Sequence, residues 1–222
     1  MKKFLCLKTR LLFFRDKKRC TIRKYFLNDS HKKWSILNIA MMIQISENIN
    51  LEPTSEKHAE SMFQAINTNR VHLSRFLPWV ENMKSITDVK EYIKNSVVQT
   101  EEKKEVSFLI VSEKSVIGRI GIHNINSQNK NASIGYWLIK EAQGKGIISK
   151  ATRSLITYAF QTLGLNRIEI RAATDNQRSR SVPERLGMLK EGTLREAELV
   201  NGKFLDLEVY SVLSSEWVSG NK

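Results

Sequence analysis

From about residue 42 onward, segments whose apolar residues recur at every second position, as in strands, alternate with segments whose apolar residues recur at helical spacing. Strand-like runs are expected over residues 43–51, 106–112, 116–123, 132–139, 168–173, 189–198 and 204–213. Helical spacing of apolar residues predicts helices over 55–67, 87–100, 149–163 and 177–186. Asn201-Gly202 between the last two runs is typical of a tight hairpin. This order of elements predicts an α/β (α+β) domain with a mixed sheet of about seven strands.

The first 41 residues follow neither period. They hold 12 Lys and Arg against 2 acids, and they contain both cysteines, Cys6 and Cys20. Met41-Met42 stands directly before the first strand pattern, so we expect Met42 to be the true start. The expected domains are therefore a basic N-terminal extension, 1–41, outside the native protein, and a folded domain, 42–222. A basic arm for RNA or a membrane surface is the alternative interpretation of this extension.

Composition narrows the class of protein. The net charge of +13 belongs mostly to residues 1–41, because residues 42–222 hold 24 basic and 21 acidic residues. Nucleic-acid binding by that part is therefore not expected. It has no cysteine, which excludes a disulfide, a cysteine nucleophile and a cysteine-ligated metal there. No apolar run approaches the ~20 residues of a membrane helix, and no secretory signal pattern is present, so a cytoplasmic protein is expected.

Residues 135–149 carry the clearest chemical signal. A strand ends, a loop with Gly144 and Gly146 follows, and a helix begins. Glycines there allow close approach of a ligand to the backbone, and a helix N-terminus presents free N–H groups to an anion. The pattern is neither a P-loop nor a dinucleotide fingerprint. By itself it fits an ordinary strand-to-helix turn as well as a pyrophosphate site.

Downstream features add to this signal. Asn176-Gln177-Arg178-Ser179 opens a short helix that Leu186-Gly187 closes, and the hairpin around Asn201-Gly202 follows. With these features in this order, residues 42–215 resemble the GNAT acetyltransferases. Within them the chain resembles the ribosomal-protein-serine/alanine N-acetyltransferases. The resemblance implies a mostly antiparallel central sheet flanked by helices, acetyl-CoA as co-substrate, no metal, and a homodimer.

The resemblance also implies roles for individual residues. The strand that holds the acetyl group and the pantetheine arm matches Trp137, Leu138 and Ile139. The loop whose amides wrap the pyrophosphate matches Gln143, Gly144, Lys145, Gly146, Ile147 and Ile148. Asn176 matches a residue that contacts the pantetheine arm. Ser179 matches the serine proposed as general acid, and Glu198 matches the glutamate proposed as general base. The segment 75–79 matches the wall of the acceptor side.

Two positions depart from the family pattern. Glu141 stands where the loop motif usually begins with Gln or Arg, and Pro183 stands where many members carry a tyrosine acid. The second departure makes Ser179 the leading candidate for the acid. Structural interpretations remain beside the functional ones: Ser179 as a helix-turn hydroxyl, Asn176 as a helix cap, and Glu198 as a solvated carboxylate. His58, His72 and His123 lack metal-ligand spacing, and a surface or core position is expected for His123.

The predicted reaction is direct attack of a primary amine on the acetyl thioester, which makes the protein an acyltransferase of EC class 2.3.1. An α-amine with a pKa of ~8 is partly neutral at pH 7, unlike a lysine amine. A carboxylate base, a backbone N–H near Leu138 or Ile139 for the oxyanion, and a donor to the thiolate would suffice. The expected acceptor is a protein N-terminal Ser or Ala. Alternatives are a small amine such as a polyamine, an antibiotic or an amino acid, a basic RNA- or ribosome-binding protein, and a coenzyme-binding protein without turnover.

Overall fold

The structure is a computed structural model that describes residues 22–24 and 41–217. Its strands are β1 Ile22–Lys24, β2 Met41–Ser46, β3 Ile49–Pro53, β4 Val106–Ser112, β5 Ser115–Asn126, β6 Asn131–Leu138, β7 Arg167–Ala173, β8 Leu189–Val200 and β9 Lys203–Leu213. Its α-helices are α1 Ala59–Thr68, α2 Arg70–Leu73, α3 Ile86–Glu101, α4 Ile147–Gln161 and α5 Gln177–Arg185. Short 3-10 turns cover Glu56–His58, Pro78–Asn82 and Lys140–Ala142. Most of the 1–41 segment lies outside the described residues.

The described strands form one sheet in the order β1-β2-β3-β4-β5-β6-β7-β9-β8. Only β6 and β7 pair in parallel, and every other neighbouring pair is antiparallel. The mixed, mostly antiparallel sheet predicted from the sequence is confirmed. Nine strands stand where about seven were expected. One of the two additional strands is β1, and the other comes from an expected strand that proves to be two.

The prediction of one strand over 43–51 is wrong. A turn at Glu47-Asn48 divides the segment into β2 and β3, which pair with each other as a hairpin. The apolar positions Ile43, Ile45, Ile49 and Leu51 keep the same alternation on both sides of this turn, and Glu47 is the one polar residue where it requires an apolar one. A single polar residue was therefore the only sign of the reversal in the pattern.

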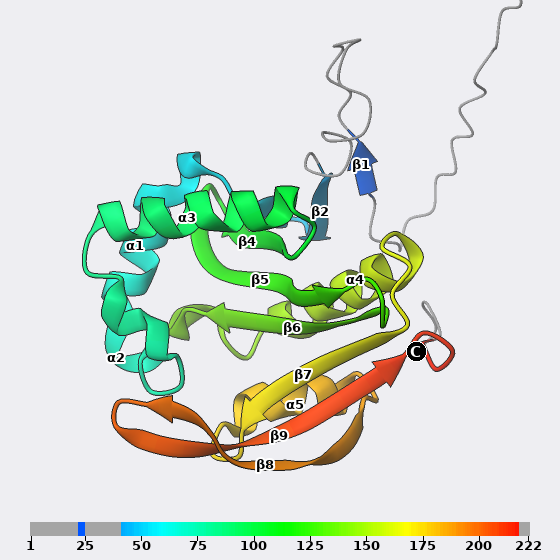
Figure 1. The fold of residues 1–222 in the computed structure, drawn as a ribbon. Helices are drawn as coiled ribbons and strands as arrows, with labels where there is room; N and C mark the ends of the chain where they lie inside the picture. Colours follow the sequence, from blue (N-terminus) through cyan, green and yellow to red (C-terminus); the bar gives the residue numbers. More distant parts are fainter. Residues whose placement is uncertain (1–21, 25–40, 218–222) are drawn as a thin grey trace, which may run out of the picture.

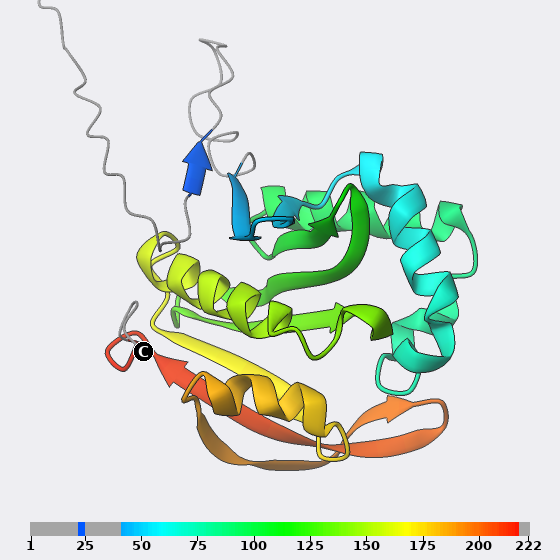
Figure 2. The same ribbon diagram turned by 180° about the vertical axis from the view of Figure 1, so that it is seen from behind.

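Helices cover the two faces of the sheet unequally. One face, at the front in Figure 1, packs α1 and α3 over β4 and β5 around a core that includes Ile66, Ile93 and Leu109. The opposite face, seen in Figure 2, carries α4 and α5 over a larger core that includes Leu155 and Ile168. We call these the α3 face and the α4 face. Both cores are nearly free of solvent, so the sheet is firmly held at its centre.

Local signals explain most element boundaries. Ser85 and Asp88 form a reciprocal capping box at the start of α3, in which the Asp88 N–H donates to Ser85 Oγ over 3.3 Å. Asn201 and Gly202 both have positive φ, at 49° and 77°, as a two-residue hairpin turn requires. The expected turn between β8 and β9 is thereby confirmed.

Some expected boundaries need correction. The helix expected from Ser55 begins as a 3-10 turn, and the Ser55 hydroxyl contacts the His58 ring instead of capping the backbone. Residues 70–82, for which no helix was predicted, contain α2 and a 3-10 turn held by Arg70, which donates to the carbonyls of Val80 and Met83. The helix expected over 149–163 begins two residues earlier, at Ile147.

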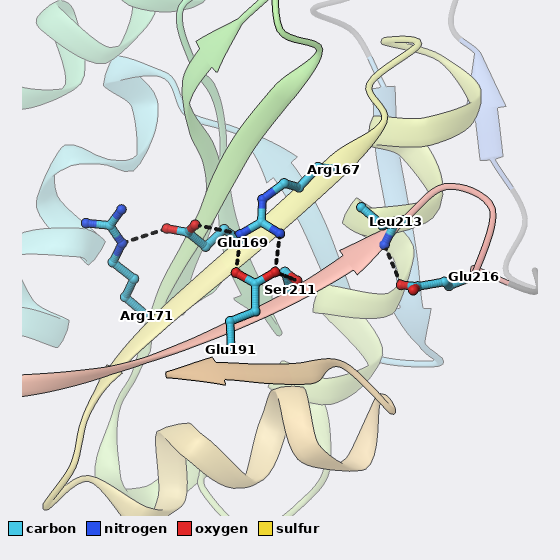
Figure 3. Close-up of polar contacts among 7 residues, drawn as sticks. All are labelled: Arg167, Glu169, Arg171, Glu191, Ser211, Leu213 and Glu216. Atoms are coloured by element: carbon cyan, nitrogen blue, oxygen red, sulfur yellow. Dashed lines mark hydrogen bonds and ion pairs between the residues drawn. The ribbon is translucent and has the colours of Figure 1, made fainter. Parts of the chain in front are cut away.

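The α3 face of β7, β9 and β8 carries an ion-pair network in place of a helix. Arg167 donates to both Glu191 and Glu169, while Arg171 donates to Glu169 (Figure 3). Ser211 donates to Glu191 over 2.6 Å. The Arg167 and Ser211 hydrogen bonds lower the pKa of the Glu191 carboxyl to about 2. The network joins three strands across the part of the sheet that borders the candidate site.

Candidate active site

The sheet opens between β6 and β7. The two strands pair only from Asn131–Ser133 to Arg167–Glu169, and they diverge beyond Ser133 (Figure 1). Trp137 and Leu138 lie in the diverging part of β6 and are 6% and 7% exposed. The divergence leaves main-chain groups of one strand without a strand partner on that side. Such an opening can receive an extended ligand between the two strands.

The hydrogen bonds of β6 show which amides face this opening. The N–H of Ile139 donates to the carbonyl of Ile117, toward β5, over 2.9 Å. Because bonding direction alternates along an antiparallel strand, the N–H groups of Leu138 and Tyr136 point away from β5, toward the opening. Of the two expected oxyanion donors, the geometry therefore favours Leu138 and excludes Ile139.

The loop after β6 has the conformation that its glycines predict. Gly144 and Gly146 have φ of 77° and 71°, and no atom lies within 4 Å of a Cβ built on either residue. The first hydrogen bond of α4 runs from the Lys150 N–H to the Gly146 carbonyl over 3.1 Å. The amides just before Lys150 have no acceptor within the helix, and the positive end of the helix dipole lies beside them. Open space, free amides and a helix N-terminus together suit a diphosphate.

Asn176 caps α5, and its side chain accepts the N–H of Ser179 over 3.1 Å. The structural role considered for Asn176 is thus confirmed. Pro183 lies inside α5 and has no N–H, so the Ser179 carbonyl four residues earlier lacks its helical donor. The hydroxyl of Tyr136 in β6 donates to that carbonyl over 3.0 Å, and the Ser179 hydroxyl donates to the Tyr136 hydroxyl oxygen over 3.4 Å. Tyr136 therefore fastens the first turn of α5 beside the opening.

Glu198 follows a wide bulge in β8. Arg195, Glu196 and Ala197 lie opposite the single residue Asp206, whose carboxylate accepts the N–H of Glu196 over 2.8 Å. The bulge changes which face the following side chains occupy, as bulges beside active sites commonly do. Glu198 pairs with Leu205, which packs with Phe76 in a small apolar cluster, so Glu198 points to that same face.

Burial raises the pKa of the Glu198 carboxyl. Its side chain has no hydrogen bond or ion pair with any residue in the described part of the chain. A half-buried carboxylate without a partner is suited to accept a proton near neutral pH. This environment differs from the solvated strand-end carboxylate that was considered as an alternative.

The two candidate catalytic residues lie on opposite faces of the sheet. Ser179 belongs to α5 on the α4 face, where it contacts Tyr136. Glu198 lies on the other face, like its cross-strand partner Leu205, which packs with Phe76. Asn201 at the tip of the β8–β9 hairpin donates to the Ser74 carbonyl over 2.9 Å and closes that side. In the segment 75–79, expected as a wall of the acceptor side, the ring of Trp79 lies 6.1 Å from that of Trp137.

Closed cavities do not define this site. A cavity of about 330 Å³ lies between α1 and Glu141, and one of about 220 Å³ lies beside the hairpin turn. Neither is lined by Ser179 or Glu198. Among residues 22–24 and 41–217, no cluster of three or more His, Cys, Asp or Glu could hold a metal ion. No helix within those residues has both the length and the apolar character that crossing a membrane would need.

Comparison with known proteins decides the family. The acetyltransferase (GNAT) domain matches residues 48–189, which is more than half of the chain. The chain belongs to the GNAT acetyltransferase family. This GNAT protein is 40% identical over 175 residues to the putative ribosomal N-acetyltransferase YdaF of Bacillus subtilis, covering 78% of this chain and 96% of the relative. It is 34% identical over 169 residues to the ribosomal-protein-serine acetyltransferase of Escherichia coli, covering 76% and 94%.

The solved structures agree with the fold. A structure of RimL, a ribosomal L7/L12 α-N-protein acetyltransferase in complex with coenzyme A, superimposes with a TM-score of 0.75 at 27% identity. The match covers 78% of this chain and 97% of that one. This GNAT protein is thus an acyltransferase that uses acetyl-CoA. The free amides, the open glycine loop and the gap between β6 and β7 fit that co-substrate.

Sequence reasoning missed three side chains at the groove. Tyr136, His72 and Arg178 come from a strand and two short helices that are far apart in sequence. His72 Nε2 lies 2.7 Å from Gln143 Nε2, and the Arg178 guanidinium donates to Gln143 Oε1. These contacts are tertiary, and no periodicity or local spacing marks them.

Proposed function

We propose that this GNAT protein acetylates the α-amine of a protein N-terminus, with an N-terminal Ser or Ala of a ribosomal protein as acceptor. The observation that carries the proposal is the position of Glu198, an unpartnered, half-buried carboxylate on the face opposite Ser179. The printed names of the two relatives above support the acceptor class. An α-amine with a pKa of ~8 needs only a modest base, and Glu198 provides one.

Trp137, Leu138, Ile139, Asn176 and the loop from Gln143 to Ile148 would hold acetyl-CoA. The diphosphate would bind the loop amides and the thioester would lie in the opening beside Leu138, which the open space at the glycines and the divergence of β6 from β7 support. The bound coenzyme supplies an acetyl thioester whose sulfur is a good leaving group. Ile139 would contribute through its position, since its N–H is already bonded to β5.

The residues then divide the proton transfers between the two faces. Glu198 removes a proton from the attacking amine as its nitrogen forms a bond to the acetyl carbonyl carbon. The Leu138 N–H donates to the oxygen that gains negative charge. As the carbon–sulfur bond breaks, the Ser179 hydroxyl donates a proton to the sulfur and regains one from solvent, to which Glu198 releases the proton taken from the amine. Tyr136 holds Ser179 in place through the Ser179 carbonyl.

Mass spectrometry of peptide products tests the acceptor. The full chain is incubated with acetyl-CoA and a Ser-initiated peptide that also contains a lysine. A matched peptide with a blocked α-amine is the control. We expect one acetyl group on the α-amine and none on the blocked peptide. Equal modification of the blocked peptide would identify lysine as the acceptor and refute the proposal.

A small cationic amine is the second candidate acceptor. The cavity of about 220 Å³ beside the hairpin turn is lined by Asp175, Glu196 and Asp206, with Lys203 as the opposing charge. Carboxylates around a small cavity suit a polyamine. Spermidine therefore serves as a third substrate in the same assay. Transfer to spermidine with none to the Ser-initiated peptide would establish this alternative.

A cytoplasmic homodimer is also proposed, since ribosomal acceptors occur in the cytoplasm. Leu189, Leu194 and Leu199 are exposed along β8, the edge strand of the sheet, and support a contact between copies. Sedimentation equilibrium of the full chain tests the dimer, which a single species of monomer mass would refute.

The extent of the domain remains a prediction. We propose that residues 42–222 form the acetyltransferase domain and that 1–41 are an extension outside the native protein. N-terminal sequencing of the native protein tests this, and a sequence beginning at Met1 would contradict it.

A further inference from the structure

Three side chains from three elements meet where the coenzyme loop begins. The Arg178 guanidinium, in the first turn of α5, donates to the Oε1 atom of Gln143. The Nε2 atom of Gln143 lies 2.7 Å from Nε2 of His72 in α2. Because Gln143 Oε1 accepts from arginine, its amide nitrogen is the donor to His72, whose Nε2 must then be unprotonated. Gln143 therefore joins α2 to α5 across the entrance of the groove.

The side chains of Arg178 and Lys140 place positive charge at this entrance. Burial lowers the pKa of His72, and the charges of Arg178 and Lys140 lower it further, whereas Glu141 and the Leu138 carbonyl oppose the shift. Two cations thus act on the same small region, beside the free amides of the α4 N-terminus. That His72 stays neutral here agrees with its role as an acceptor for Gln143.

Arg178 has an unusual set of partners for a surface arginine. In the described part of the chain its guanidinium bonds to the neutral amide of Gln143 and forms no ion pair. By contrast, Arg180, two residues further along the same helix, pairs with Glu208 at 3.1 Å. A guanidinium held by a neutral group keeps its charge uncompensated, and its planar donors match phosphate oxygens well.

We propose that Arg178 binds the diphosphate of coenzyme A from the α5 side, facing the amides of the 143–148 loop. Gln143 holds the guanidinium at the groove before the coenzyme arrives, which reduces the entropy lost on binding. The inference rests on the coenzyme site proposed above. It adds a charged residue from α5 to a cradle otherwise built from backbone amides.

Isothermal titration calorimetry with the full chain tests this assignment without any acceptor. The ligands are coenzyme A, 3′-dephospho-coenzyme A, and pantetheine, which lacks all phosphates. Arg178→Ala is compared with wild type and with Arg185→Ala, which removes the same charge from the exposed last turn of α5. Loss of a charge-assisted contact predicts binding of both nucleotides weakened by about 10- to 100-fold. Pantetheine binding and the Arg185→Ala variant should match wild type.

Each departure from that pattern overturns the proposal. If Arg178→Ala binds coenzyme A as tightly as wild type, Arg178 makes no contact with the coenzyme. A loss confined to coenzyme A, with dephospho-coenzyme A unaffected, moves the contact to the 3′-phosphate. An equal loss for pantetheine indicates a structural role, which a lowered melting temperature would accompany. If wild type binds none of the ligands, the coenzyme site itself is misplaced, so failure of the site and failure of the Arg178 assignment are distinguishable.

Discussion

Replacing Glu208 with glutamine tests how α5 is held in position. The Glu208 carboxylate in β9 is 6% exposed and lies under α5. It accepts hydrogen bonds from Arg180 of α5 at 3.1 Å, from Lys190 of β8 at 2.7 Å and from Tyr210 at 2.6 Å. Tyr210 also contacts Glu184 of α5 at 2.9 Å. One buried carboxylate thereby joins two strands to the helix that carries Ser179.

The size of the effect follows from the ionisation of Glu208. Burial alone would raise its pKa, but the hydrogen bonds from Lys190, Tyr210 and Arg180 outweigh burial and lower it to about 2 from 4.5. A shift of that size corresponds to roughly 3 kcal/mol of stability at neutral pH. Since the folded pKa is depressed, this stability is present above pH 4.5 and is lost as the pH falls toward 2. Glu208→Gln should therefore be about 3 kcal/mol less stable than wild type at pH 7.

Urea unfolding followed by circular dichroism at pH 7, 5.5, 4 and 3 measures this difference. The gap between wild type and Glu208→Gln should be constant from pH 7 to 5.5 and shrink at pH 4 and 3. Glu91→Gln, at an exposed position of α3 without a partner in the described residues, is the control and should match wild type throughout. A gap that does not depend on pH would refute the ionic explanation and leave only packing.

Further predictions concern the site. Glu198→Gln should lower kcat at least about 100-fold. Because the base must be ionised and burial raises the pKa of Glu198, kcat/KM of wild type should fall with decreasing pH at a pKa above the ordinary glutamate value. Glu196→Gln, at an exposed position of the same bulge, should keep the wild-type pH profile. Tyr136→Phe should lower the free energy of unfolding by about 1–2 kcal/mol in urea titrations, since the Ser179 carbonyl loses its donor. Gly146→Ala should cost about 1–2 kcal/mol in the same titrations, because its φ of 71° disfavours a side chain.

Much of the fold could be predicted because its signals are local. A short run of apolar, β-rich residues located β4, the Asn201-Gly202 pair located the hairpin, and apolar spacing located α3. The β2–β3 turn escaped prediction because the apolar residues before and after it keep the same alternation, which only Glu47 interrupts. Residues 70–82 escaped because contacts of Arg70 with distant carbonyls order them, and such contacts leave no periodic pattern.

In the candidate site, too, the local features could be predicted and the features that depend on tertiary contacts could not. The glycine loop and the Asn176 cap are each formed by neighbouring residues in the sequence, and the local conformation of each is as expected. Glu198 could be named only by resemblance, because its orientation depends on a bulge whose hydrogen bond to Asp206 spans the hairpin. A pattern of side chains along β8 could not show that three residues oppose one.

Pro183 shows how a departure from the family pattern acquires a physical meaning. The sequence revealed only that a tyrosine acid was missing at this position. In the structure, the proline also removes the donor to the Ser179 carbonyl, and Tyr136 from another strand supplies a donor there. The substitution therefore couples the position of Ser179 to β6, the strand whose amide at Leu138 faces the opening. On this argument β6 contacts the proposed acid through Tyr136 and carries the proposed oxyanion donor, so the positions of both depend on that strand.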